Sequence, residues 1–156
     1  MKEFEAVIKW LEECQNESDG SWCEIDSGQK GIYLVKQKIV YTSQVIRAFA
    51  ATGNQEKKCV DHGLSFLRSC EEIKDDGLYD FGLKFAPFHE CGRTEIARSL
   101  AERVAAKQRS GGLWEFRRSG LPFFGVLFGL EILWEAGIKG FEVYIDRGIQ
   151  FLIENQ

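Results

Sequence analysis

The sequence predicts an all-α protein built from a repeated helix and turn, and three observations support this. An apolar ridge at helical spacing occurs over 8–15, 64–71 and 149–156, with apolar residues at the first, third and fourth places of each copy. Glycine-containing turns of similar sequence follow the helices. No segment alternates convincingly between apolar and polar residues, as a half-buried strand would. Helices joined by similar turns are therefore expected along the whole chain.

Each repeated turn ends with a glycine, one spacer residue and an aromatic residue. The copies are Gln15–Gly20–Trp22, Glu71–Gly77–Tyr79 and Gln108–Gly112–Trp114. Glycine takes the positive φ that the chain needs after a helix, and the aromatic ring can fold back over the helix end. A glutamine in the last turn can bond an unpaired backbone group across the junction. The turn is thus expected to join neighbouring helices.

The apolar spacing, together with the stop signals, predicts six helices in one domain of residues 1–156. Their expected bounds are about 2–14, 38–52, 56–70, 93–107, 121–136 and 141–154. Residues 23–37 and 71–92 are left as long loops, which carry function more often than short ones do.

The Gln-x-x-x-Gly-x-Trp turn resembles the QW motif of squalene–hopene and oxidosqualene cyclases, and is similar to the repeats of protein prenyltransferase β subunits. Gln108, Gly111 or Gly112, and Trp114 carry the resemblance best. Gln15 and Trp22 match with one extra residue between them. The resemblance covers nearly the whole chain. It implies an α/α toroid, in which inner and outer helices alternate around a central cavity for an isoprenoid.

The repeat spacing departs from that family. The anchors at 15, 71, 108 and 156 are separated by 56, 37 and 48 residues, and 37 residues are too few for a long loop and two helices. One helix is therefore expected to be missing between Glu71 and Gln108. The chain is interpreted as a partial or reduced toroid: a fragment, a small relative, or a half that closes against a second copy.

Aromatic side chains in the turns and long loops are the candidates for ligand binding. In a cyclase such rings stabilise carbocations by cation–π attraction, although packing in the core would also explain most of them. The candidate residues are Trp22, Tyr33, Tyr79, Phe85, Phe88, His89 and Trp114.

No catalytic residue is predicted. The D-x-D-D and D-D-x-x-D acids of terpenoid cyclases are absent, and Asp75–Asp76 suits a turn. Protein prenyltransferases hold zinc with Asp, Cys and His. His89 and Cys91 are weak candidates for such a site, and a capped helix start with a buried cysteine is the preferred explanation of them.

Composition excludes several classes of protein. A net charge of −4 gives no general attraction to nucleic acid, and the longest uncharged stretch, 119–130, is too short to span a bilayer. Five cysteines without a C-x-x-C pair or a signal peptide favour the cytoplasm.

Three functions remain open from the sequence. The first is a non-catalytic toroid-like protein that binds an apolar, isoprenoid-like molecule or a partner toroid segment, with homo-oligomers included. The second is an enzyme of the terpenoid cyclase or prenyltransferase type, acting as a subunit or completed by oligomerisation. The third is a helical-repeat scaffold that binds protein.

Overall fold

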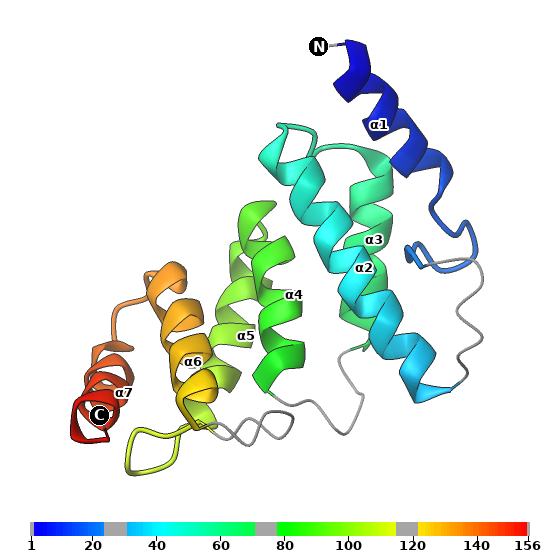
Figure 1. Cartoon of the computed structure of the whole chain (residues 1–156). Helices are drawn as coiled ribbons and strands as arrows, with labels where there is room; N and C mark the ends of the chain where they lie inside the picture. Colours follow the sequence, from blue (N-terminus) through cyan, green and yellow to red (C-terminus); the bar gives the residue numbers. More distant parts are fainter. Residues whose placement is uncertain (1, 24–30, 71–77, 115–121, 156) are drawn as a thin grey trace. The chain divides into compact units, whose positions relative to one another are not determined.

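The computed structural model describes residues 2–23, 31–70, 78–114 and 122–155, which form seven helices without a strand (Figure 1). The predicted all-α fold class is therefore confirmed. The chain divides into two compact units, residues 1–73 and 74–156. That all 156 residues form one repeat domain stays a prediction. Within the described ranges, every helix is too short or too polar to cross a lipid bilayer.

The first unit contains three helices, of which α2 and α3 lie side by side. They are α1 (Lys2–Glu13), α2 (Ile32–Ala51) and α3 (Lys58–Ser69). The core of this unit includes Ile46 and Phe49 of α2 and Val60 and Leu67 of α3, all of them fully buried. Helix α2 begins six residues earlier than predicted, so the second half of the expected 23–37 loop is helical.

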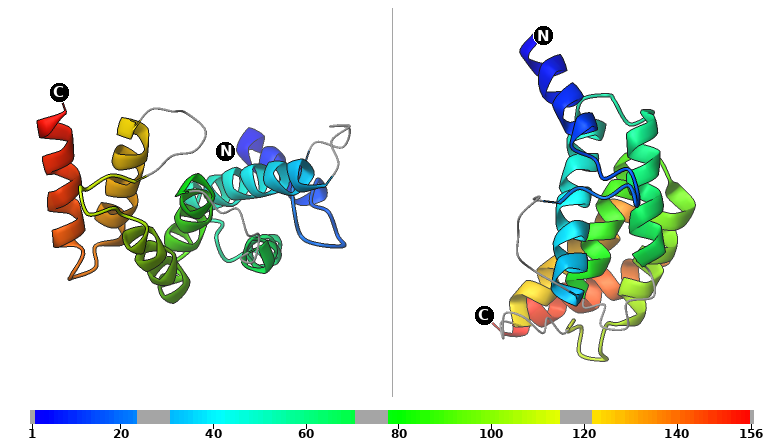
Figure 2. Two further views of the ribbon diagram at one scale, coloured as in Figure 1. Left: turned by 90° about the horizontal axis from the view of Figure 1, so that it is seen from below. Right: turned by 90° about the vertical axis from the view of Figure 1, so that its right-hand side faces the viewer.

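The second unit contains four helices, and α6 packs against each of the other three. They are α4 (Leu78–Glu90), α5 (Thr94–Ala106), α6 (Pro122–Ala136) and α7 (Glu142–Glu154). Figure 2 shows α6 and α7 as neighbouring antiparallel helices. The buried side chains include Phe81 and Phe85 of α4, Leu100 of α5, and Leu133 of α6.

Helix α4 corrects the prediction of a loop over 71–92. Its residues Phe81, Phe85 and Phe88 are spaced as one helical face, and each is at most 2% exposed. Pro87 lies inside the last turn of the helix, although proline disfavours helix interiors. The apolar face outweighs this single breaker, since burial of three aromatic rings stabilises the helix more than one lost backbone hydrogen bond costs it.

The expectation of a missing helix is therefore wrong as well. Both α4 and α5 fit between the repeat anchors because the connection between them is only three residues long. In this turn the N–H of Arg93 donates to the carbonyl of Phe88 at 2.8 Å, and the N–H of Gly92 donates to that of His89 at 3.0 Å. These bonds satisfy carbonyls at the end of α4 and reverse the chain at once.

The first Gln–Gly–Trp turn joins α1 to α3. The Gln15 side-chain amide donates to the carbonyl of Gly20 at 2.8 Å and to that of Cys59, in the first turn of α3, at 2.7 Å. The indole N–H of Trp22 folds back and donates to the carbonyl of Leu11 at 2.7 Å. Trp22 is only 3% exposed. The roles predicted for the glutamine and the aromatic ring are both confirmed.

Asp19 ties this turn to α2. Its carboxylate accepts hydrogen bonds from the backbone N–H and hydroxyl of Ser21 and forms an ion pair of 2.6 Å with Lys38. Partial burial by itself would raise the pKa of Asp19. The hydrogen bonds from Lys38 and Ser21 lower the pKa by more than burial raises it, so that it lies below its ordinary value of 3.8. The turn therefore carries a fixed negative charge at neutral pH.

The second turn repeats the same arrangement in the other unit. The Gln108 amide donates to the carbonyl of Gly112 at 3.3 Å and to that of Tyr144, in the first turn of α7, at 2.7 Å. The indole N–H of Trp114 donates to the carbonyl of Val104 at 2.8 Å, and the ring is fully buried. Gly112, at φ 83°, is the counterpart of Gly20, at φ 75°. The two turns are thus copies of one helix joint, while the Glu71–Gly77 copy lies outside the described residues.

Both joints include a second glycine, on the helix that the glutamine reaches. A Cβ atom on Gly63 of α3 would come within 2.6 Å of the Trp22 ring, and one on Gly148 of α7 within 3.0 Å of the Trp114 ring. Because glycine has no side chain, the backbone of α3 packs directly against the Trp22 ring and that of α7 against the Trp114 ring. The match between Gly63 and Gly148 was visible in the sequence as part of the repeat.

Candidate functional site

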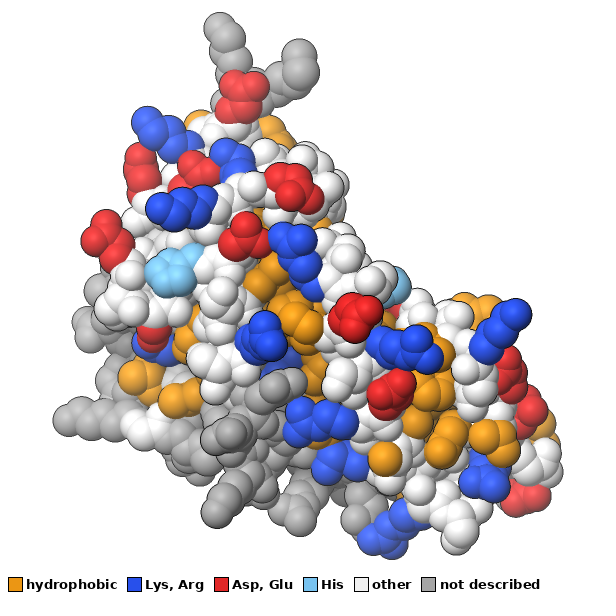
Figure 3. Space-filling model, turned by 180° about the vertical axis from the view of Figure 1, so that it is seen from behind, with side chains coloured by type: hydrophobic (Ala, Val, Ile, Leu, Met, Phe, Trp, Pro, Cys, Tyr) orange, Lys and Arg blue, Asp and Glu red, His pale blue; other side chains and the backbone are white. Residues whose placement is uncertain are grey.

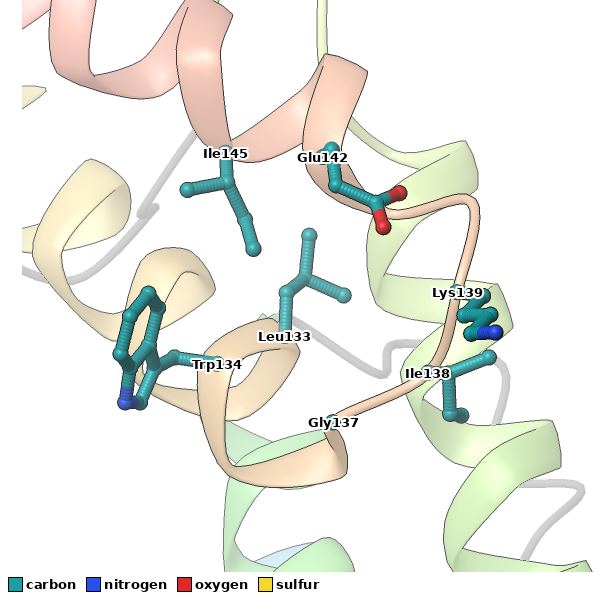
Figure 4. A pocket seen from close by; sticks show the side chains of 7 residues that line it. All are labelled: Leu133, Trp134, Gly137, Ile138, Lys139, Glu142 and Ile145. Atoms are coloured by element: carbon teal, nitrogen blue, oxygen red, sulfur yellow. The ribbon is translucent and has the colours of Figure 1, made fainter.

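A hollow of about 290 Å³ opens where α6 meets α7. It is lined by Leu133, Trp134, Gly137, Ile138, Lys139, Glu142 and Ile145. Figure 4 shows Leu133 of α6 and Ile145 of α7 pointing toward one another across it. Its charged groups are Lys139 and Glu142, and none of its seven lining residues is Ser, Cys, His or Asp. The hollow can therefore hold an apolar group beside two opposite charges.

A short connection between α6 and α7 shapes the hollow. Helix α6 ends at Ala136, and Gly137 follows with a positive φ. The Glu142 carboxylate accepts a hydrogen bond of 2.6 Å from the N–H of Gly140, which fixes the start of α7. The connection therefore brings the last turn of α6 against the first turn of α7, with Trp134 and Ile145 on the same side.

An apolar surface, exposed except at the half-buried Ile145, extends from this hollow along both helices. It is defined here as the α6–α7 face and consists of Phe124, Leu127, Trp134, Ile145, Ile149 and Ile153. Leu127 and Trp134 are two turns apart on α6, and the three isoleucines recur every four residues on α7, so each set forms a stripe. The two stripes meet because Trp134 and Ile145 line the same hollow.

The exposure of this face is high for large apolar side chains. Trp134 is 76% exposed, Phe124 58%, Leu127 56% and Ile153 58%. Single exposed apolar residues are common on proteins, but several large ones on two packed helices are typical of an interaction site. Figure 3 shows, on one face of the molecule, hydrophobic side chains gathered in patches between charged ones. Apolar surface is thus available for a partner.

Most of the ligand-binding candidates predicted from the sequence are buried or stacked. Trp22 and Trp114 belong to the helix joints, and Phe85 and Phe88 are core residues on the buried side of α4. His89 stacks on Phe85, with ring centroids 5.2 Å apart. The expectation that Phe85 and Phe88 occupy a loop is wrong, because they belong to a helix. Their role in ligand binding stays a prediction.

The remaining two candidates fall partly outside the described residues. Tyr33 and Tyr79 lie in the first turns of α2 and α4, and their side chains are not among those described. None of the five candidates whose side chains are described lines the hollow between α6 and α7. The structure therefore brings together a different set of residues from the set that the sequence suggested.

The described residues hold no group of three or more His, Cys, Asp or Glu side chains placed to bind a metal ion. His89 is the last basic residue of α4, and Cys91 is buried directly after that helix. The zinc site considered from these two residues thus has no third ligand in the part of the chain that is described. It stays a weak prediction.

Trp134 and the α6–α7 face were missed by sequence reasoning, although one signal was present. Helix α6 is apolar nearly all round, with Glu131 and Glu135 as its charged residues. Such a helix is typical of a position covered on every side, whereas the structure leaves one side of α6 open. The apolar composition of α6 was therefore the signal that could have pointed to this open side.

Comparison with known proteins found no matching family model, no matching curated protein and no matching solved structure.

Proposed function

We propose that this chain is a non-catalytic helical-repeat protein that binds an apolar partner on the α6–α7 face. Its helix joints resemble the QW turns of terpenoid cyclases and protein prenyltransferase β subunits, so its relation to the α/α toroid family is part of the proposal. The observation that carries the binding function is the exposure of Trp134, Leu127 and Phe124 on one side of α6.

The arrangement of the hollow favours binding over catalysis. Its described lining is mainly apolar, with Leu133, Trp134 and Ile145 among its large side chains, and no Ser, Cys or His is among the described lining residues. A terpenoid cyclase or prenyltransferase activity remains an alternative prediction from the turn resemblance alone.

A second candidate function is the binding of an isoprenoid-like molecule in the hollow. The apolar wall favours it, because a prenyl chain would contact Trp134 and the neighbouring aliphatic side chains. The volume of about 290 Å³ lies at the lower end of the range for small-molecule sites, roughly 300–1,000 Å³. A short prenyl chain therefore fits better than a squalene-sized one.

Binding of the neutral dye Nile red tests the proposed apolar site. We expect the double variant Leu127→Ser, Trp134→Ser to lose at least about two thirds of the dye fluorescence, since these two side chains provide much of the exposed apolar area. The matched control is Val7→Ser, Trp10→Ser on α1, where Trp10 is 60% exposed. The proposal fails if the α1 variant loses as much fluorescence or the α6–α7 variant loses none. Farnesol that leaves the dye bound would contradict the isoprenoid candidate.

A further inference from the structure

We infer that the natural occupant of the α6–α7 face is an amphipathic helix with basic residues beside its apolar stripe. This inference rests on the proposed function, because it requires the same face to be a binding site. It adds the chemistry of the partner, which is a positively charged helical segment of another protein.

Acidic side chains border the apolar face on both helices. Glu131 and Glu135 are exposed on α6 beside Leu127 and Trp134 respectively, and Glu142 and Asp146 are exposed on the first turns of α7. In the described part of the chain, Glu131, Glu135 and Asp146 have no ion-pair partner. A basic partner would supply the missing opposite charges, whereas a neutral or acidic one would not.

Two cations of the described residues lie near these four acids. Lys139 lines the hollow together with Glu142, and Arg147 follows Asp146 on α7, so the balance of this group stays negative. Exposed charges at the edge of an apolar contact mainly control which partner binds and how fast it associates. The apolar stripe is therefore expected to provide affinity, and the acids to select the sign of the partner's charge.

The repeat places two positions of the α7 stripe at buried positions of α3. The positions of Ile145 and Ile149 on α7 correspond, 85 residues earlier, to Val60 and Leu64 on α3. Val60 is fully buried and Leu64 is 5% exposed, whereas Ile149 is 44% exposed. These two positions are thus buried in one copy of the repeat and at least partly open in the other, while Ile153 corresponds to Arg68. A partner that packs as a helix would restore on α7 the burial that α3 has.

The size of the face fits a single helix. Helices of 13 and 15 residues are about 20 Å long, which matches a partner helix of roughly four turns. The exposed parts of its large side chains amount to on the order of 500 Å², taking about 150–250 Å² for a fully open aromatic side chain. A single helical segment of that length can therefore cover the face.

Self-association is further disfavoured by charge. Two copies that pair through this face would bring Glu131, Glu135, Glu142 and Asp146 against the same residues, and like charges in an interface are destabilising. The chain as a whole also has a net charge of −4.

Two fluorescein-labelled peptides of 14 residues test the inference by fluorescence anisotropy. Both carry leucines at helical spacing, and the remaining positions are lysine in one and glutamate in the other. We expect wild type to bind the leucine–lysine peptide at least about tenfold more tightly than the leucine–glutamate peptide. Glu131→Lys, Asp146→Lys should remove this preference, and Trp134→Ala should weaken both peptides. Trp10→Ala on α1 is the matched control and should change neither.

The other outcomes separate this inference from the proposed function. Equal affinity for the two peptides, or a lysine preference that survives in the Glu131→Lys, Asp146→Lys variant, overturns the inference. If neither peptide binds while Nile red still requires Leu127 and Trp134, the basic helix is wrong and the apolar site stands. Concentration-dependent dimers in sedimentation that disappear in Trp134→Ala would identify a second copy as the occupant and overturn the inference too.

Discussion

Replacing Trp114 by alanine is expected to lower the free energy of unfolding of the unit formed by residues 74–156 by about 3–5 kcal/mol. The ring is fully buried and its indole N–H donates to the carbonyl of Val104 at 2.8 Å, so alanine would leave a cavity and remove this buried hydrogen bond. Urea unfolding followed by circular dichroism measures the loss.

Two further variants show which property of Trp114 matters. Trp114→Phe keeps most of the ring volume but removes the donor, and we expect it to cost about 1–3 kcal/mol. Trp134→Ala makes the same change at a residue that is 76% exposed, and it should shift the stability by less than about 0.5 kcal/mol. Equal losses for Trp114→Ala and Trp134→Ala would contradict the role assigned to the joint.

Gly112→Ala is expected to destabilise the same unit by more than roughly 2 kcal/mol. Gly112 has φ 83°, where an alanine is strained, and a Cβ atom there would lie 2.1 Å from the carbonyl oxygen of Arg147. The backbone of α7 would have to move away, and the Gln108 amide would lose its contact with the carbonyl of Tyr144, which lies 2.7 Å away.

The neighbouring glycine provides the control for this prediction. Gly111 has no positive φ, and a Cβ atom on it would meet nothing within 4 Å. Gly111→Ala should therefore leave the urea midpoint nearly unchanged. A larger loss from Gly111→Ala than from Gly112→Ala would show that the turn is held differently from the arrangement described above.

The helix joints could be predicted because their residues act locally. Gln15, Gly20 and Trp22 lie within eight positions, and each residue type has one suitable task at a helix end. The two copies then make the same bonds, from Gln15 to Cys59 and from Gln108 to Tyr144. The sequence could not predict which two carbonyls accept these bonds, because the acceptor depends on which helix packs against the turn.

Helix α4 and the α6–α7 face could not be predicted in the same way. Pro87 and the nearby glycines resemble loop punctuation, and the helical spacing of Phe81, Phe85 and Phe88 was read as a set of loop aromatics. The α6–α7 face could not be predicted for a different reason. Spacing identifies the apolar side of a helix, but it does not say whether another element covers that side, and on α6 one part is buried while Leu127 is 56% exposed.

Hydrogen–deuterium exchange in the presence of the leucine–lysine peptide tests most directly where a basic amphipathic helix binds. A docked helix should slow amide exchange along residues 123–155, because it excludes water from the open sides of α6 and α7 and reduces their local opening. Exchange in α1, which has its own exposed Trp10, should not change. Slower exchange in α1 but not in α6 and α7, or no change anywhere at a saturating peptide concentration, would contradict the assignment of the α6–α7 face as the binding site.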